Sequence, residues 1–398
     1  MDPLIQNLYN VLTQVQGYIY PNEVELHWSL LIVLYPYITG LVAGAFILAS
    51  LERVFRVKEV RPTYEISLIT ALALLLTATL PLVSHLTKPF RAYEIMITPH
   101  PTSAMAIFGF VYLWYLMVVL LLEIWFDYRR DFVIWSQEKT GIMKWVYKIL
   151  TLGVMDVSPE TLKWDERLGR IVTIIGIPSA FLLHGYVGFI FGSIKANPWW
   201  STVLMPVIFI FSAMVSGIAL VMLLYMIISK LRRVKVDMAC LDTIGRYLLY
   251  ALVLDFSLEA LDQIHRFYEA EESFEIISLL MSGKLYITLI IVQLLMGTII
   301  PLATLGLLQV YKPSERKRRL IYWMDSVLVL IGIFAMRWNV VIGGQLFSKS
   351  FYGFTAYKLE LIGREGFLVS SGLMVLPFII LIFLLWLLPP WKKQAETL

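Results

Sequence analysis

The chain has 398 residues, of which 59% are hydrophobic and only 16% are charged, and its formal net charge at pH 7 is +4. A soluble domain is typically about a quarter charged, so this composition indicates a polytopic membrane protein. The single cysteine, Cys240, excludes a disulfide framework, a cysteine-ligated iron–sulfur cluster and covalent haem attachment within the chain. Membrane topology explains the positive charge, so nothing predicts nucleic-acid binding.

Nine stretches are apolar and long enough to cross a bilayer, which takes about twenty residues as a helix. They cover residues 27–51, 65–86, 102–126, 169–193, 200–229, 240–262, 282–309, 320–343 and 366–388. Residues 1–26 are expected to form an N-terminal surface segment with helical spacing, and residues 27–393 a single membrane domain. In the segment 131–152, Trp, Ile and Leu alternate with Lys, which predicts a helix lying in the membrane interface.

The loops between these spans differ in their content of lysine and arginine. The loops after the odd-numbered spans hold 23 of these residues, and the loops after the even-numbered spans hold 8. Because positive charge is retained on the cytoplasmic side, this alternation predicts an N-terminus outside and a C-terminus in the cytoplasm. The expected fold is an all-α integral membrane protein in the cytoplasmic membrane, arranged as two four-helix bundles with a flanking span.

Ionisable residues within the spans gather in the predicted outer half of the membrane. Asp255, Glu259 and Asp262 are spaced i, i+4, i+7, so they share one face of a helix. Arg337 lies in the last third of an apolar run that also carries Asn339. A charge at that depth costs roughly 2.5–3.5 kcal/mol on insertion scales and normally faces a partner or a wet cavity. We therefore expect the acidic face to look toward Arg337 or toward a water-filled pocket.

The histidines belong to the same outer half. His27, with Glu25 beside it, lies at the outer end of the first span, and His184 lies past the midpoint of the fourth. A partly buried carboxyl or imidazole can exchange protons near neutral pH, so Glu259 and His184 are the candidate proton-transfer groups. The alternative is a set of buried ion pairs that only fixes helix packing.

Metal and haem sites are not favoured by the sequence. His85 and His184 form the only histidine pair that comes near the geometry of a b-type haem site, and His85 is followed at once by a loop-like stretch with Lys88 and Pro89. No HExxH, paired-cysteine or phosphate-loop pattern is present, so no metal site is predicted. In the inner half, the acids are interpreted as solvated helix ends; they are Glu123, Asp127, Asp242 and Asp325.

Five segments together resemble one known family of membrane subunits. They are HWSLLIVLYPYITGLVAGAFILASLERV (27–54), SHLTKPFRAYEIMITPHPTSAM (84–105), PSAFLLHGYVGFIFG (178–192), FSLEALDQIHRFY (256–268) and MRWNVVIGGQLFSKSFYGF (336–354). In this order they resemble the NrfD/polysulfide reductase membrane-subunit family, and within it the subunits of DsrMKJOP-type sulfur-metabolism complexes. The similarity covers essentially the whole chain. Several relatives have eight or ten spans, against nine predicted here.

The resemblance implies a subunit with no haem or iron–sulfur cluster of its own that exchanges menaquinone near the outer face. An extracytoplasmic ferredoxin-like iron–sulfur subunit, a multihaem cytochrome and other membrane and cytoplasmic subunits would be its partners. Carried over to this sequence, the quinone-proximal positions are Glu25, His27, His184, Tyr186, Glu259 and Arg337. The predicted quinone site also includes Asn339, with Asp255, Asp262 and His85 in support. Polysulfide reductase members use an Asn and a Tyr as headgroup ligands, and His27 and His184 occupy about those places here.

The sequence therefore predicts a quinone-reactive membrane subunit of a respiratory complex, in which menaquinol loses two electrons to the iron–sulfur partner and its protons leave by the acid and histidine cluster. The direction of electron flow is left open. A secondary transporter or proton-conducting protein that uses the same polar cluster is the alternative from another class, and a subunit with a purely scaffolding role is a third.

Overall fold

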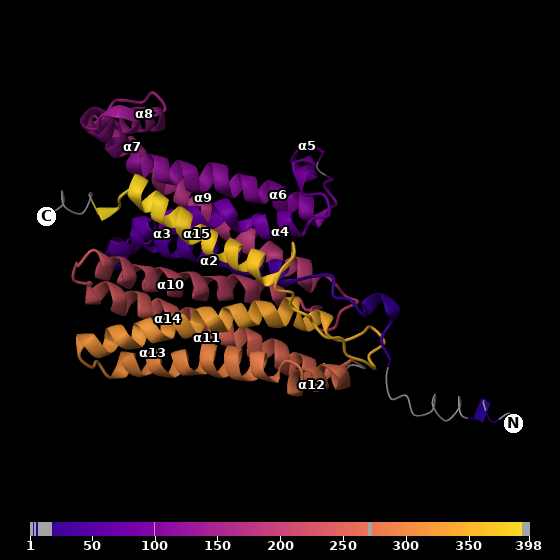
Figure 1. The fold of residues 1–398 in the computed structure, drawn as a ribbon. Coiled ribbons are helices and arrows are strands. Elements are labelled where there is room, and N and C mark those ends of the chain that lie inside the picture. Colours follow the sequence, from indigo (N-terminus) through magenta and orange to yellow (C-terminus); the bar gives the residue numbers. More distant parts are fainter. Residues whose placement is uncertain (1–2, 4, 7–17, 99, 270–272, 392–398) are drawn as a thin grey trace.

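The computed structural model describes residues 3, 5–6, 18–98, 100–269 and 273–391. Over these residues the chain is helical, and its only extended pairing is an isolated bridge between Phe347 and Phe354. The long helices lie side by side, with residues 18–29 at one end and residues 388–391 at the other (Figure 1). The surface helix predicted near the N-terminus lies largely outside the described residues.

Eight helical rods in the described chain are long and apolar enough to cross a membrane. They are α2 (Leu30–Arg53), α3 with α4 (Tyr64–Ala78, Leu80–His85), α6 with η4 and α7 (Ala104–Trp114, Tyr115–Leu120, Leu121–Glu138), α9 (Pro159–Gly192), α10 (Met205–Leu231), η5 with α13 (Tyr286–Ile299, Ile300–Val310), α14 (Glu315–Val341) and α15 (Phe367–Leu387). The prediction of an all-α integral membrane protein is confirmed.

The sixth of the nine predicted spans, 240–262, is not among these eight. It lies within α11 (Met238–Glu269), which has 32 residues and is long enough to cross a bilayer. Its charged residues, including Arg246 and Asp255, make it too polar to count as a membrane span by composition. It nevertheless packs against α10 and α13 within the bundle, where its Asp255 and Asp262 are buried.

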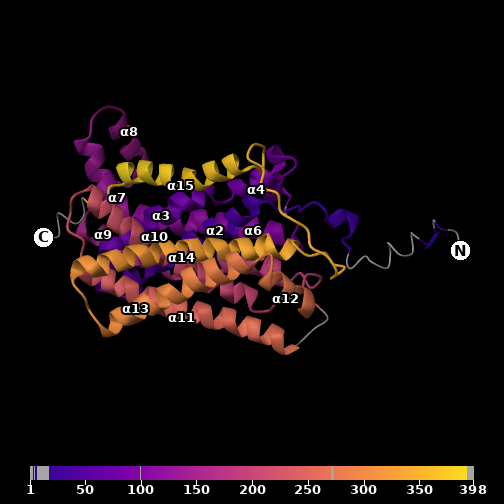
Figure 2. The same cartoon turned by 60° about the horizontal axis from the view of Figure 1, so that its bottom comes forward.

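The helices form two bundles of four with one helix at the side. The first contains α2, α3–α4, α6–α7 and α9, and the second contains α10, α11, η5–α13 and α14. Helix α15 packs on α3 and α2, on the side away from α11 and α13 (Figure 2). The strongly basic connections, α7–α9, α10–α11 and α13–α14, lie at the end where α15 finishes (Figure 1), which we name the inner end following the sequence prediction.

The two bundles meet where α2 crosses α10. Every residue of the apolar window of α2 is buried. Two glycines allow the close approach: a Cβ on Gly44 would lie 2.0 Å from the carbonyl oxygen of Ala213, and one on Gly217 would lie 2.4 Å from the backbone nitrogen of Ala45. Small residues at such crossings let helix backbones pack directly against each other in membranes.

Gly217→Ala is expected to destabilise this crossing by about 1–3 kcal/mol, because the added methyl group overlaps backbone that cannot move independently. The measurement is the thermal midpoint of unfolding of the detergent-solubilised protein. Gly372→Ala is the matched control, since a Cβ at Gly372 in α15 meets nothing within 4 Å. Equal midpoints for the two variants would show that the crossing tolerates a methyl group.

The helix predicted at 131–152 is divided in two. Residues up to Glu138 continue α7, and α8 (Gly141–Leu150) follows a break at which Gly141 has a φ of +63°. Ile142 and Trp145 of α8 are exposed, as expected for a helix at the membrane interface.

Helix α9 begins soon after α8. Just before its start, hydrogen bonds from the Thr161 hydroxyl and the Ser158 backbone hold the pKa of Asp156 below its usual range.

Short helical segments complete the described fold. They are η1 (Pro21–Glu23), η2 (Lys58–Thr63), η3 (Pro89–Arg91), α5 (Glu94–Ile97), α12 (Phe274–Ser282) and η6 (Gly343–Gln345). All of them except η2 lie at the outer end, where α12 packs against η5 and covers the second bundle.

Candidate functional site

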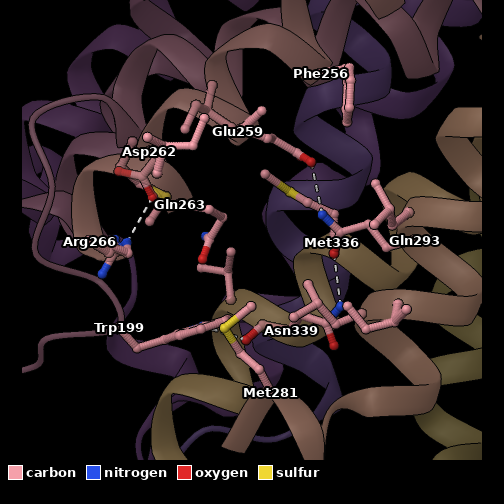
Figure 3. Close-up of a pocket in the computed structure, with 18 residues that line it drawn as sticks. Trp199, Phe256, Glu259, Asp262, Gln263, Arg266, Met281, Gln293, Met336 and Asn339 are labelled. Atoms are coloured by element: carbon pink, nitrogen blue, oxygen red, sulfur yellow. Dashed lines mark hydrogen bonds and ion pairs between the residues drawn. The ribbon is translucent and has the colours of Figure 1, made fainter. Parts of the chain in front are cut away.

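A cavity of about 350 Å³ lies in the outer half of the second bundle, between α10, α11, η5 and α14 (Figure 3). Its volume is within the range of small-molecule sites, about 300–1,000 Å³. Most of its wall is aliphatic, aromatic or methionine side chain. Its polar groups are few and are contributed by Glu259, Asp262, Gln263, Arg266, Gln293 and Asn339. This combination of an apolar wall and a few polar groups is typical of a site for an apolar ligand with a polar headgroup.

A chain of three hydrogen bonds leads to the carboxylate of Glu259. The Thr288 hydroxyl donates to Asn339 Oδ1 (2.6 Å), Asn339 Nδ2 donates to Gln293 Oε1 (2.8 Å), and Gln293 Nε2 donates to Glu259 Oε2 (3.1 Å). All donors point the same way, so each amide is fixed in orientation by its neighbour. Glu259 Oε1 has no hydrogen-bond partner among the described residues, and the side chain lines the cavity (Figure 3). That oxygen is therefore free to bind a ligand.

The element that carries Thr288 and Gln293 is a π-helix of 14 residues, η5. The two side chains are five residues apart, which is about one turn of a helix with i→i+5 hydrogen bonds, so both face α14 and bond to Asn339 there. Of the two, Gln293 also lines the cavity. Gly297 lets η5 approach α14 closely, because a Cβ there would lie 2.4 Å from the Cα of Gly332. Single π-turns are often found at functional sites, and a run of this length is unusual.

An ion pair closes the outer side of the cavity. Asp262 accepts hydrogen bonds from Arg266 Nε (2.9 Å) and from the Thr202 hydroxyl (2.6 Å), and Arg266 also donates to the carbonyl of Pro198. Beyond this pair is a second cavity of about 900 Å³, which shares Asp262 and Arg266 with the first and includes His265. Asp262 is thus neutralised by Arg266.

Arg337 lies behind the cavity wall and is fully buried. Its Nη2 donates to the Ser212 hydroxyl (2.6 Å) and to His184 Nε2 (3.0 Å), and its guanidinium lies over the ring of Phe209 at 4.0 Å. No carboxylate in the described chain lies within the 4.0 Å of an ion pair with it, so the acidic face makes no ion pair with Arg337. Two of the three acidic residues of that face line the cavity, which corresponds to the second of the two orientations expected from the sequence.

The surroundings of His184 define its protonation state. A guanidinium can only donate, so His184 Nε2 must accept from Arg337, and the ring proton must lie on Nδ1. Nδ1–H then donates to the Thr39 hydroxyl (3.3 Å), which donates to the carbonyl of Tyr35 (2.9 Å). His184 is fully buried with both nitrogens bonded, and it does not line the cavity. This geometry favours a role in holding Arg337, and proton transfer by His184 stays a prediction.

The residues predicted at the outer end of the first span lie outside the cavity. Glu25 and His27 are exposed ahead of α2. The neighbouring Trp28 stacks on Trp200 with ring centroids 5.0 Å apart, and its backbone N–H donates to the side chain of Gln345 (3.0 Å). This packing seals the outer end of α2 and leaves Glu25 and His27 at the surface.

Three further predicted residues also lie away from the cavity. Tyr186 is partly buried, with its ring 6.1 Å from that of Phe189. His85 pairs with Glu365 (3.0 Å) at the outer surface. Asp255 is buried about one turn below Glu259, and its Oδ1 has no hydrogen-bond partner. Of the predicted set, the structure brings Glu259, Asp262 and Asn339 together at the cavity.

The interpretation of the inner acids as solvated ends is wrong for three of them. The side chain of Asp127 is 5% exposed and forms an ion pair with Arg53 (2.8 Å). Glu123 is fully buried and accepts hydrogen bonds from the hydroxyls of Thr173 (2.8 Å) and Tyr64 (3.2 Å). Asp325 is 2% exposed and accepts one from Thr304 (2.8 Å). The sequence prediction placed all three at headgroup level, but neighbouring helices cover them.

Sequence reasoning also missed the hydroxyl groups that organise the site. They are Thr39, Thr202, Ser212 and Thr288. Each is a polar residue within or next to an apolar run. This pattern is common in membrane helices, so it does not identify a site unless the residue that bonds to the hydroxyl is also known. Over the described residues there is no group of three or more His, Cys, Asp and Glu side chains that could hold a metal ion.

The chain was compared with protein families and with curated proteins. The profile of the family described as "Polysulphide reductase, NrfD" matches residues 21–349. The C subunit of the selenate reductase of Mesobacillus selenatarsenatis is 28% identical over 394 residues, covering 93% of this chain and 87% of that protein. The membrane C subunit of a putative dimethyl sulfoxide reductase of Halobacterium salinarum is 25% identical over 56% of this chain and 48% of that protein. Protein NrfD of Escherichia coli is 27% identical over 50% of this chain and 59% of that protein. The chain therefore belongs to the NrfD polysulphide reductase family and is a multi-pass membrane protein.

Proposed function

We propose that the protein is the quinone-reactive membrane subunit of a respiratory oxidoreductase complex in the cytoplasmic membrane. The observation that carries this proposal is the carboxylate of Glu259, which offers a free oxygen to a cavity whose wall is mostly apolar. Oxidation of menaquinol to menaquinone releases two electrons and two protons. A carboxylate beside the quinol hydroxyl is the group that such a reaction needs as a proton acceptor.

The electrons must pass to another chain. A cysteine-ligated cluster cannot form on the single cysteine, Cys240, so an iron–sulfur protein docked at the outer end supplies the electron acceptor in this proposal. The names of two relatives support a reductase complex, since they are subunits of a selenate reductase and a putative dimethyl sulfoxide reductase. The reverse reaction, reduction of menaquinone by the same partner, uses the same residues.

Two kinds of complex fit this role. The five sequence segments favour a DsrMKJOP-like sulfur-metabolism complex with a multihaem cytochrome among its subunits. The match to the selenate reductase protein, which spans most of both chains, favours a terminal reductase. Affinity purification of the complex separates them, because a multihaem cytochrome that co-purifies supports the first and a large reductase subunit without haem supports the second.

Binding of a quinone to the purified protein tests the function itself. We expect the wild type to bind a naphthoquinone analogue in detergent, and absence of binding would contradict the proposal in favour of a transporter or a scaffold. His27→Ala is expected to keep that binding, since His27 is exposed and lies outside the cavity. Loss of binding in this variant, with an unchanged thermal midpoint, would place the site at the outer end of the first bundle instead.

A further inference from the structure

Helices α11 and η5 diverge on one side of the second bundle. Helix α11 packs against α10 and α13, whereas η5 packs mainly against α14 and α12. Because η5 and α13 form one continuous rod, α11 contacts the inner half of that rod and separates from its outer half. The cavity occupies the space between them, lined by Phe256, Ala260 and Ile264 from α11 and by Ile290 and Leu294 from η5.

This side of the cavity faces lipid. Only 17% of the apolar window of η5 and α13 is buried inside the protein, so the outer surface of this rod meets acyl chains. Ile264 is 63% exposed, and Ala260 and Ile290 are partly exposed, although all three also line the cavity. The cavity wall is thus thin and aliphatic toward the bilayer, while the Asp262–Arg266 pair closes it toward the outer end.

One polar contact crosses the gap at the cavity. It is the hydrogen bond from Gln293 of η5 to Glu259 of α11 (3.1 Å; Figure 3). When this bond opens, Glu259 keeps its free Oε1 and gains a second free oxygen, and the two helices lose the link between their facing sides. The residue that the proposed reaction needs is therefore also the residue that joins the two sides of the gap.

We propose that the gap between α11 and η5 is the lateral portal for the long isoprenoid chain of the quinone, and that the Glu259–Gln293 hydrogen bond is its latch. This inference rests on the proposed function. The headgroup lies between Glu259 and Asn339, where the hydrogen-bonding groups are, and the chain leaves to the bilayer past Ala260 and Ile290. An isoprenoid chain matches this exit because it is flexible, branched and apolar, like the side chains that line it.

The portal is tested by filling it with a larger side chain. Ala260→Trp puts an indole into the gap, and Ile290→Trp does so from the opposite helix. Each variant is assayed as the whole complex in proteoliposomes, with a long-chain menaquinol and with a tailless naphthoquinol. We expect the KM for the long-chain quinol to rise about tenfold or more in both variants, and the KM for the tailless quinol to change by less than about threefold. The reason is that only the long-chain substrate occupies the gap while it is bound.

Leu254→Trp is the matched control, because Leu254 lies on the same helix, is 49% exposed and does not line the cavity. It should alter neither KM. An equal rise in KM for both quinols in the Ala260 and Ile290 variants would overturn the portal and indicate damage to the headgroup site. Unchanged KM values for both quinols would overturn it as well. A wild-type complex that oxidises neither quinol would instead contradict the proposed function.

Discussion

Glu259→Gln is expected to lower quinol oxidation by the assembled complex by about 10²–10⁴-fold, the usual contribution of a positioned general base. The amide has nearly the shape of the carboxyl, and its oxygen can still accept the hydrogen bond from Gln293. The cavity therefore keeps its form, while the group that takes up the quinol proton is lost. The measurement is the steady-state rate of electron transfer from menaquinol to the iron–sulfur partner.

The control for this variant is Glu269→Gln, on the same helix about three turns farther out, where Glu269 is exposed at the rim of the second cavity. Its rate should stay within about twofold of the wild type, as is usual when a residue makes no contact in the transition state. Co-purification of the partner proteins shows that both variants assemble. Full turnover by Glu259→Gln would mean that another group accepts the proton, and the cavity would lose its assigned role.

Much of the fold follows from the sequence because the bilayer imposes it. In lipid, a helix must form all its backbone hydrogen bonds internally, so a spanning helix appears in the sequence as an apolar run of about twenty residues. Eight of the nine predicted runs are long apolar helices in the described chain. Helix α11 is the exception, because several of its acidic residues are paired or buried inside the protein. Asp242 bonds to Arg318, Asp255 is buried and Asp262 bonds to Thr202, and the hydropathy of one segment does not register such partners.

The candidate site was predicted only in part. Helical spacing showed that Asp255, Glu259 and Asp262 share a face, and the structure has Glu259 and Asp262 lining one cavity. The choice of partners could not be predicted, because it depends on how neighbouring helices are rotated. Arg266, four residues along the same helix, neutralises Asp262, and a hydroxyl and an imidazole from other helices surround Arg337. Depth along the helices indicates only that Arg337 and the acidic face lie at the same level, which leaves both an ion pair and a shared pocket open.

The position of Arg337 leads to the second large effect. Arg337→Met is expected to slow quinol oxidation by roughly 5–30-fold, which corresponds to an electrostatic contribution of about 1–2 kcal/mol. Neither Asp255 nor Glu259 lies within ion-pair distance of the guanidinium, so any effect of its charge on these carboxyl groups acts at longer range. The fixed cation therefore stabilises the ionised, proton-accepting form of Glu259 from behind the cavity wall. Met336 lies between them: it lines the cavity, and its sulfur accepts a hydrogen bond from Arg337 Nη1 (3.0 Å).

Arg337 does not touch the cavity, so the loss in Arg337→Met should appear in kcat and leave KM unchanged. Stability should change little, because removal of a buried charge saves its desolvation cost while His184 and Ser212 lose one hydrogen-bond donor. Arg337→Lys keeps the charge and should restore kcat to within about threefold of the wild type. If Arg337 only fixes helix packing, the opposite result is expected: Arg337→Met would lower the thermal midpoint and keep kcat, and Arg337→Lys would rescue neither because it cannot stack on Phe209 in the same way.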